Sequence, residues 1–312
     1  MKDSMLENLL KTIADITGET DGAFNLRKDG IGVIRHSTEN IEIKSKEDKP
    51  GIDIIVKPHT KGEKVHIPVV ITETGVNDLV YNDFFIGEGA EVDIVAGCGI
   101  HNCGSSASEH DGIHTFYISK GAKVTYVEKH YGEGEGTGDR ILNPTTIVHM
   151  EEGSYCEMEM TQIEGVTSTV RETEANLGKD AKLVVTEKLM THDKQHATSN
   201  ITANLNGKNS ILQIVSRSVA KNDSTQSFHP IAVGNEKCRA HIQCDSIIMD
   251  NAKVASIPEI QANHTDAAII HEAAIGRINN EQLLKLETFG LDEEQAEAVI
   301  VEAFLSLSHI HI

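Results

Sequence analysis

Aromatic residues are scarce in this sequence of 312 residues, and tryptophan is missing altogether. Phenylalanine, tyrosine and tryptophan together make up 4 % of the chain. The core must therefore be built from isoleucine, valine, leucine, alanine and methionine. That composition suits a repeated stack of similar layers more than a sandwich held by large rings. At this length the chain could form one large all-β domain or two smaller domains, and either could bury a substantial core.

Positive charge is also in short supply. The chain has 28 lysine and arginine residues against 48 aspartate and glutamate residues, which gives a formal net charge of −20. This balance argues against binding to nucleic acid or to an anionic membrane surface. No apolar run reaches membrane-spanning length, and the first residues do not resemble a cationic, apolar signal segment. We therefore expect an acidic cytoplasmic protein.

The five cysteines are odd in number and widely spread. This pattern argues against a disulfide framework and favours a reducing compartment. In such a compartment the cysteines would be buried residues, metal ligands or reactive thiols.

Alternating apolar and polar residues run from about residue 65 to residue 275. In one example Val65, Ile67 and Val69 alternate with His66 and Pro68. A period of two residues over such a length predicts strand after strand, each with one buried face.

A weak repeat accompanies these strands, in which a turn is followed by a small residue and then by a strand. The small residues are Ala90, Ala122, Ser154, Ala181 and Ser210, with spacings of 32, 32, 27 and 29 residues. This drifting spacing predicts a β-solenoid, because each coil of a solenoid buries its face on its neighbours. A meandering sandwich is the competing fold.

The two ends of the chain have different patterns. Residues 4–17 predict an amphipathic helix, and turn-rich sequence up to residue 60 predicts hairpins or irregular strands. After Gly276 the period becomes helical, and two short helices are expected to cap the core or to form a face that docks a partner. We divide the chain into residues 1–60 (helix and irregular strands), 61–276 (solenoid core) and 277–312 (helical docking segment).

The stretch from residue 241 to residue 289 combines soft and hard ligands. Cys244 lies on a strand, and His271 and Glu272 follow 27 and 28 residues later. Successive strand residues point to opposite faces, so at most one of His271 and Glu272 can join Cys244 inside a coil unless a bulge intervenes. Cys244 could also be an ordinary buried thiol.

A second group of candidate ligands surrounds the segment CGIHNC. It comprises Cys98, His101 and Cys103, with His110 and His114 downstream. Thiolates and imidazoles suit zinc, or iron in a cluster, although the Cys-x4-Cys spacing is a weak signal and the loop could be an unremarkable glycine-rich turn. His264 is a weaker candidate ligand because it lies at a turn.

The glycine-rich segment GEGEGTGD does not match a phosphate-binding loop, since it has no lysine and acidic residues stand between its glycines. Any nucleotide chemistry would therefore have to come from another protein.

The sequence resembles the SufB/SufD family, the scaffold proteins of SUF-type iron–sulfur cluster assembly. The resemblance is carried by the segments QCDSIIMDNAKVASIPEIQA, HEAAIGRINNEQLLKL and FGLDEEQAEAVIVEAFL. It implies a mainly β fold with a right-handed parallel β-helix core and short helical ends. It also implies that Cys244 and Glu272 receive sulfur or hold a nascent, transient cluster, with His271 beside them. The His-Glu pair is the SufB-like form.

The same resemblance implies partners. A SufC-type ABC ATPase would dock on the C-terminal helices, at Leu283, Leu284, Leu286, Phe289, Val299, Ile300 and Phe304. A cysteine desulfurase system would donate sulfur, and the chain would pair with itself or with a paralogue. The chain is shorter than typical SufB proteins, which favours a homodimer, and the need for a flavin is left open.

Our leading hypothesis is a non-catalytic scaffold for iron–sulfur cluster assembly. A β-solenoid zinc enzyme that uses Cys98, His101 and Cys103 is one alternative. A cluster-free structural subunit of an ABC ATPase complex is another.

Overall fold

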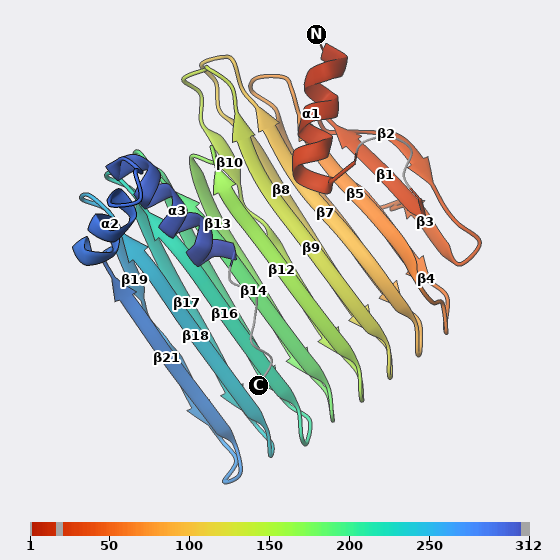
Figure 1. Cartoon of the computed structure of the whole chain (residues 1–312). Helices are drawn as coiled ribbons and strands as arrows, with labels where there is room; N and C mark the ends of the chain where they lie inside the picture. Colours follow the sequence, from red (N-terminus) through yellow and green to blue (C-terminus); the bar gives the residue numbers. More distant parts are fainter. Residues whose placement is uncertain (1, 17–20, 307–312) are drawn as a thin grey trace.

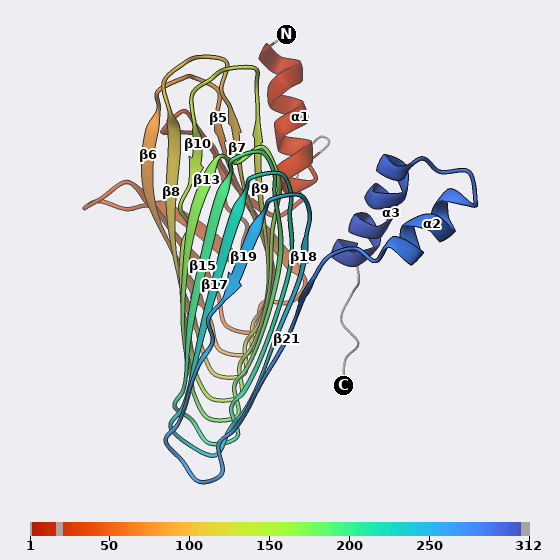
Figure 2. The same cartoon turned by 90° about the vertical axis from the view of Figure 1, so that its left-hand side faces the viewer.

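The computed structural model describes residues 2–16 and 21–306, and 57 % of the chain lies in β-strands. The chain winds into a β-solenoid of about 8 turns, and the strands of successive turns form two facing sheets (Figures 1 and 2). The predicted mainly β fold, with a solenoid core and short helices at both ends, is confirmed.

The first sheet contains ten strands, which are, in spatial order, β2 (Ile31–His36), β1 (Ala23–Lys28), β5 (Glu63–Ile71), β7 (Glu91–His101), β9 (Lys123–Glu133), β12 (Tyr155–Glu164), β14 (Lys182–Thr191), β16 (Ile211–Ala220), β18 (Arg239–Ile248) and β21 (Ala268–Gly276). The second sheet contains β19 (Lys253–Ser256), β17 (Thr225–Gly234), β15 (His196–Leu205), β13 (Ser168–Leu177), β10 (Arg140–Leu142), β8 (Ser108–Ile118), β6 (Asn77–Ile86), β4 (Gly51–Val56) and β3 (Ile41–Ser45). Two further short strands complete it: β11 (Thr145–Met150) pairs with β8 and β13, and β20 (Glu259–Ala262) pairs with β17.

Each coil gives one strand or strand pair to each sheet, and neighbouring coils pair in parallel. The hairpins β1–β2 and β3–β4 are antiparallel and stand at the N-terminal end of the stack. They are the hairpins predicted for the turn-rich region. Both join the core directly, because β1 pairs with β5 and β4 pairs with β6.

The small residues of the predicted repeat stack on one another at one corner of the solenoid. The strand register aligns the residues that follow them, since Glu91 pairs with Lys123 and Lys123 with Tyr155. None of the five predicted positions is more than 1 % exposed, so these small side chains are enclosed between neighbouring coils. Cys238 and Ala267 occupy the next two positions of the same ladder, beyond the five that were predicted.

Three aromatic rings of the core are gathered in one place. Phe84 stacks on Phe116 with ring centroids 4.3 Å apart, and Phe116 meets the ring of Tyr126 edge-on at 5.0 Å. All three side chains are fully buried. The rest of this core is mainly aliphatic, as the composition predicted, and Phe228 of β17 adds one further ring.

Helix α1 (Lys2–Ala14) lies on the outer face of the first sheet, over β5, β7 and β9 (Figure 2). The close approach requires glycine at position 97, because a Cβ atom there would lie 2.2 Å from the carbonyl oxygen of Ile13. The helix begins two residues before the predicted start and ends at Ala14; residues 17–20, the end of the predicted helix, lie outside the described chain.

Helices α2 (Asn280–Glu287) and α3 (Glu293–Ser306) follow the last strand and lie beside the outer face of the first sheet (Figure 2). Val301 and Leu305 of α3 pack with Val219 and Met249 of the solenoid. Among the described helices, none is both long and apolar enough to cross a membrane.

Candidate functional site

The inner face of the last coil brings Cys244 and His271 together. They lie on the neighbouring strands β18 and β21, where Ile242 pairs with His271 and Cys244 pairs with Ala273. His271 is thus diagonal to Cys244 on the same face, and its Nε2 atom is 3.0 Å from the Cys244 Sγ atom. The cysteine is buried, while the histidine is partly accessible.

The surroundings of this pair keep both groups neutral. Burial raises the pKa of Cys244 to about 11, and the nearby Ser256 hydroxyl only partly opposes this effect. Burial also lowers the pKa of His271, and the nearby His241 adds to the shift. Any soft metal or sulfur that bonds to Cys244 must displace its proton, and the imidazole nitrogen beside it is placed to accept that proton.

Glu272 lies on the opposite face of β21, as the alternation of strand side chains predicted. Its side chain is 65 % exposed, and one carboxylate oxygen is 3.6 Å from His241 Nε2 on the outside of the solenoid. The structure therefore gathers two of the three predicted site residues. Within one chain, Glu272 does not reach the sulfur of Cys244.

The pair stands close to an uncovered end of the stack. Strand β21 ends the first sheet, and β19 and β20 end the second (Figure 1). Large apolar side chains are exposed on these last strands and the segment between them, namely Ile257, Ile260, Ile270 and Ile275. Such a surface is typical of an interface.

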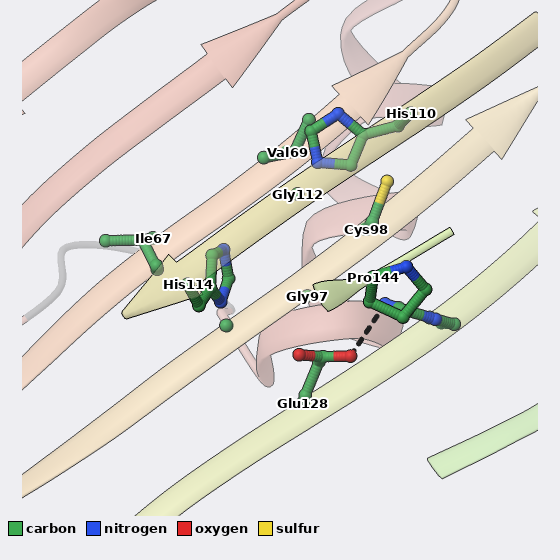
Figure 3. Close-up of a pocket in the computed structure, with 11 residues that line it drawn as sticks. Ile67, Val69, Gly97, Cys98, His110, Gly112, His114, Glu128 and Pro144 are labelled. Atoms are coloured by element: carbon green, nitrogen blue, oxygen red, sulfur yellow. Dashed lines mark ion pairs between the residues drawn. The ribbon is translucent and has the colours of Figure 1, made fainter. Parts of the chain in front are cut away.

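Cys98 is separated from His101 and Cys103, but it lies near His110 and His114 of its predicted group. It lines a small cavity of about 20 Å³, which has room for about one water molecule (Figure 3). His110 and His114 of β8 line the same cavity from the second sheet, and Glu128 and His130 line it from β9. Burial raises the pKa of the Cys98 thiol far above its usual value, so this sulfur stays protonated.

The charges around this cavity belong to a buried ion-pair network. Glu128 Oε1 is 2.8 Å from the Arg171 guanidinium and 2.9 Å from His130 Nε2. Arg171 in turn approaches Glu187, at 3.7 Å. Although burial alone would raise it, the pKa of Glu128 is held well below its usual value by the charge of Arg171.

Glu128 and Cys244 belong to one column of inward-facing residues along the first sheet. The column runs, strand by strand, through Glu128, Met160, Glu187, Ser216 and Cys244. The sequence patterns considered above did not identify its charged members, Glu128 and Glu187. Following which alternate residues of each strand face the interior would have identified them.

The buried His114 should make the stability of the fold depend on pH. Its pKa is lowered to about 4, mainly because burial disfavours the charged imidazole, whereas an unfolded histidine titrates near 6.5. Between these values the unfolded chain binds a proton that the folded chain does not. The contribution of His114 to the stability of the fold is therefore complete above pH 6.5 and is lost as the pH falls. We expect the free energy of unfolding to drop by about 2 kcal/mol more between pH 7 and pH 5 in the wild type than in His114→Gln.

Urea unfolding of both proteins at the two pH values measures this difference. Equal pH dependence in the two proteins would show that His114 is not the group responsible. The overall stability of the variant does not enter the comparison.

The predicted zinc group of Cys98, His101 and Cys103 is not assembled. Cys98 faces the interior, whereas His101 faces outward at the end of β7 and Cys103 lies on the exposed corner beyond it. Within residues 2–16 and 21–306, no three His, Cys, Asp or Glu side chains converge to hold a metal ion. His264 lies at a distant turn, where its Nδ1 atom accepts a hydrogen bond from the Asp266 backbone N–H.

The residues predicted to dock a partner are distributed over α2, α3 and the turn between them. Helix α2 has no buried residue. Leu284, Phe289 and Val299 are 61, 75 and 44 % exposed, and Phe304 is partly buried against the solenoid. The remaining three, Leu283, Leu286 and Ile300, are half-buried. The three exposed side chains therefore lie on α2, on α3 and on the turn between them.

Comparison with known proteins gives the family. Residues 77–304 match the family model described as "SUF system FeS cluster assembly, SufBD core domain". An iron–sulfur cluster assembly SufBD family protein of Methanocaldococcus jannaschii is 31 % identical over 271 residues, covering 85 % of this chain and 84 % of the relative. A SufBD family protein of Archaeoglobus fulgidus is 27 % identical over 79 % of this chain and 66 % of its own length.

A chloroplastic SufBD family protein of Arabidopsis thaliana is 26 % identical over 70 % of this chain, which spans only 40 % of that relative. The match to the family model covers most of the solenoid, including both strands of the Cys244–His271 pair, and extends into α3. The chain therefore belongs to the SufBD family of iron–sulfur cluster assembly proteins.

Proposed function

We propose that this chain is a scaffold on which an iron–sulfur cluster is built, with Cys244 as the sulfur acceptor or iron ligand. The observation that carries the proposal is the 3.0 Å contact between Cys244 Sγ and His271 Nε2 on the inner face of the last complete coil. Thiolate and imidazole are both ligands of iron–sulfur clusters, and imidazole is the weaker partner, which suits a cluster that must be handed on.

Within the described residues, Cys244 and His271 are the two potential ligands that meet at this site, and a cluster needs more. The exposed apolar strands at the end of the solenoid support pairing with a second molecule, which would bring a second set of ligands close to the first. We favour a second copy of this chain, and a paralogue is the alternative. Glu272, on the outer face, would then serve the cluster only through a change at that interface.

A SufC-type ABC ATPase is the partner we propose for α2 and α3. The exposed side chains of Leu284, Phe289 and Val299 offer an apolar docking surface. The sequence has no phosphate-binding loop of its own, so ATP would be hydrolysed by that partner. Sulfur would come from a cysteine desulfurase, and whether a flavin takes part is not constrained by the residues at the site.

The test is anaerobic loading with ferrous iron and a sulfide source, using the chain coexpressed with its ATPase. Wild type, Cys244→Ser and the matched control Cys103→Ser are assayed for bound iron, bound sulfide and visible absorption. We expect the chromophore to be lost in Cys244→Ser and kept in Cys103→Ser, because only Cys244 lies beside His271 within the core.

A chromophore that survives in Cys244→Ser would overturn the proposed site. If no protein bound iron or sulfide, the chain would instead be a cluster-free subunit of the ATPase complex. Size-exclusion chromatography of the wild type beside Ile270→Asp tests the proposed interface. We expect the variant to elute with a smaller apparent molecular mass than the wild type.

A further inference from the structure

A second cysteine–histidine pair lies at the corner that follows β7, on the outside of the solenoid. The Sγ atom of Cys103 is exposed and 3.0 Å from His101 Nε2. The other ring nitrogen, His101 Nδ1, is 2.9 Å from Glu133 Oε1. His101 and Glu133 are register partners on β7 and β9, so the imidazole and the carboxylate are set side by side by the sheet itself.

The contacts of Glu133 determine which ring nitrogen of His101 carries the proton. Its second oxygen accepts a hydrogen bond from the Tyr131 hydroxyl, at 3.3 Å, and Tyr131 packs against helix α1. A carboxylate on Nδ1 favours the tautomer in which Nδ1 carries the proton. That tautomer leaves Nε2 free to accept the proton of Cys103.

The glycine-rich segment that matched no phosphate loop holds the cysteine in place. Its backbone packs directly against the backbone around Cys103. There the Gly136 N–H donates to the Asn102 carbonyl (3.0 Å), and the Gly138 N–H donates to the Gly104 carbonyl (2.9 Å). A Cβ atom at Gly136 would lie 2.4 Å from the Gly104 carbonyl oxygen, so only glycine permits this stacking. Buried Asn102 braces the same corner by donating to the Ser106 carbonyl at 2.9 Å.

We propose that Cys103, His101 and Glu133 form an activated-thiol site that exchanges with the divalent sulfur of a disulfide or a persulfide. Cys103 is the nucleophile, His101 is the base, and Glu133 is a positioning residue. The proposal is independent of cluster assembly at Cys244.

Electrophilic sulfur is the substrate class that this corner fits. Acyl transfer also needs donors aimed at a developing oxyanion, usually within a pocket. Exchange at sulfur needs only a thiolate, in-line access and a group that takes and returns a proton. An exposed cysteine with an oriented imidazole supplies those three things.

The step balances without an added oxidant or reductant. The Cys103 proton passes to His101 Nε2, and the resulting thiolate attacks one sulfur of R–S–S–R′. A new Sγ–S bond forms while the old S–S bond breaks, and the departing thiolate takes the proton back from His101. If R–S–S–H is the donor, Cys103 ends as a persulfide and R–SH is released.

The test uses the full chain and 4,4′-dithiodipyridine, a small disulfide that the negatively charged protein does not repel. The Cys103 rate is the difference between wild type and Cys103→Ala, because the other four cysteines are buried. An unassisted thiol is only a few per cent thiolate at pH 7, so we expect the rate to fall about tenfold in His101→Asn. His192→Asn, a change at another partly exposed histidine with an acidic neighbour, should leave it unchanged.

Glu133→Gln should lower the rate less than His101→Asn and should alter its pH profile between pH 6 and pH 8, which a merely structural role would not do. A second arm with glutathione persulfide, read by mass spectrometry on Cys103, decides whether a persulfide is also a donor. A His101→Asn rate within about twofold of wild type would overturn the proposal, because exposure alone would then explain the reactivity. So would a Cys103 that reacts with neither reagent.

Discussion

Replacing Arg171 by methionine is expected to be among the most damaging single changes to the stability of this fold. Arg171 stands between two buried carboxylates, at 2.8 Å from Glu128 and 3.7 Å from Glu187. Without the guanidinium, Glu128 remains as a charge in the core with only neutral partners. Removing one member of a buried ion pair costs about 3–5 kcal/mol, and urea unfolding followed by circular dichroism measures the loss.

The double variant Arg171→Met with Glu128→Gln is the control for this reasoning. It removes both charges, so part of the lost stability should return. Burial already raises the pKa of Glu187, which can take up a proton, and Glu187 should therefore tolerate the change better than Glu128. A single variant within about 1 kcal/mol of wild type would show that Arg171 does not balance these charges.

Phe84→Ala is the second large effect, and its neighbour Phe85 provides a matched control. The Phe84 ring is fully buried and stacks on Phe116, whereas the Phe85 ring is 39 % exposed and stacks on Tyr117 outside the solenoid. Truncation of a buried phenylalanine costs about 3–5 kcal/mol, because it removes apolar area and leaves a cavity. The same truncation at Phe85 should cost about 1 kcal/mol, since water already reaches that ring.

Both variants differ from wild type by the same atoms on adjacent residues of β6. A comparison of their unfolding free energies in urea therefore isolates burial. Equal losses for the two would contradict the assignment of Phe84 to the core and Phe85 to the surface.

The solenoid could be predicted from the sequence because two signals agreed along the same stretch. Alternation gave the strands, and the recurring small residues gave the coil, since a tight corner can be recognised without knowing what it packs against. The ladder was not followed to Cys238, because the repeat was recognised from alanine and serine positions. Strand alternation also predicted correctly that His271 and Glu272 face apart.

The partners of each site residue were harder to predict, because they depend on coil lengths that vary. Cys244 and His271 are 27 residues apart, close to the length of one coil, and so they become neighbours. The same reasoning was not applied to Glu128 and Arg171, which lie on different sheets and meet across the interior. Cys98 and Cys103 are close in sequence, but β7 ends between them and sends one inward and the other to the surface.

The stack of parallel strands also sets a fixed distance between the two cysteines for which we propose sulfur chemistry. Cys103 follows β7 and Cys244 lies on β18, and five inter-strand steps separate these strands in the first sheet. At about 4.8 Å for each step, the separation along the stack is about 24 Å. Direct bond formation between two cysteines needs Cα atoms within about 7 Å, so these two thiols never exchange within one molecule. Sulfur taken up at Cys103 can reach Cys244 only if a carrier moves it, and the number of coils determines how far that carrier must travel.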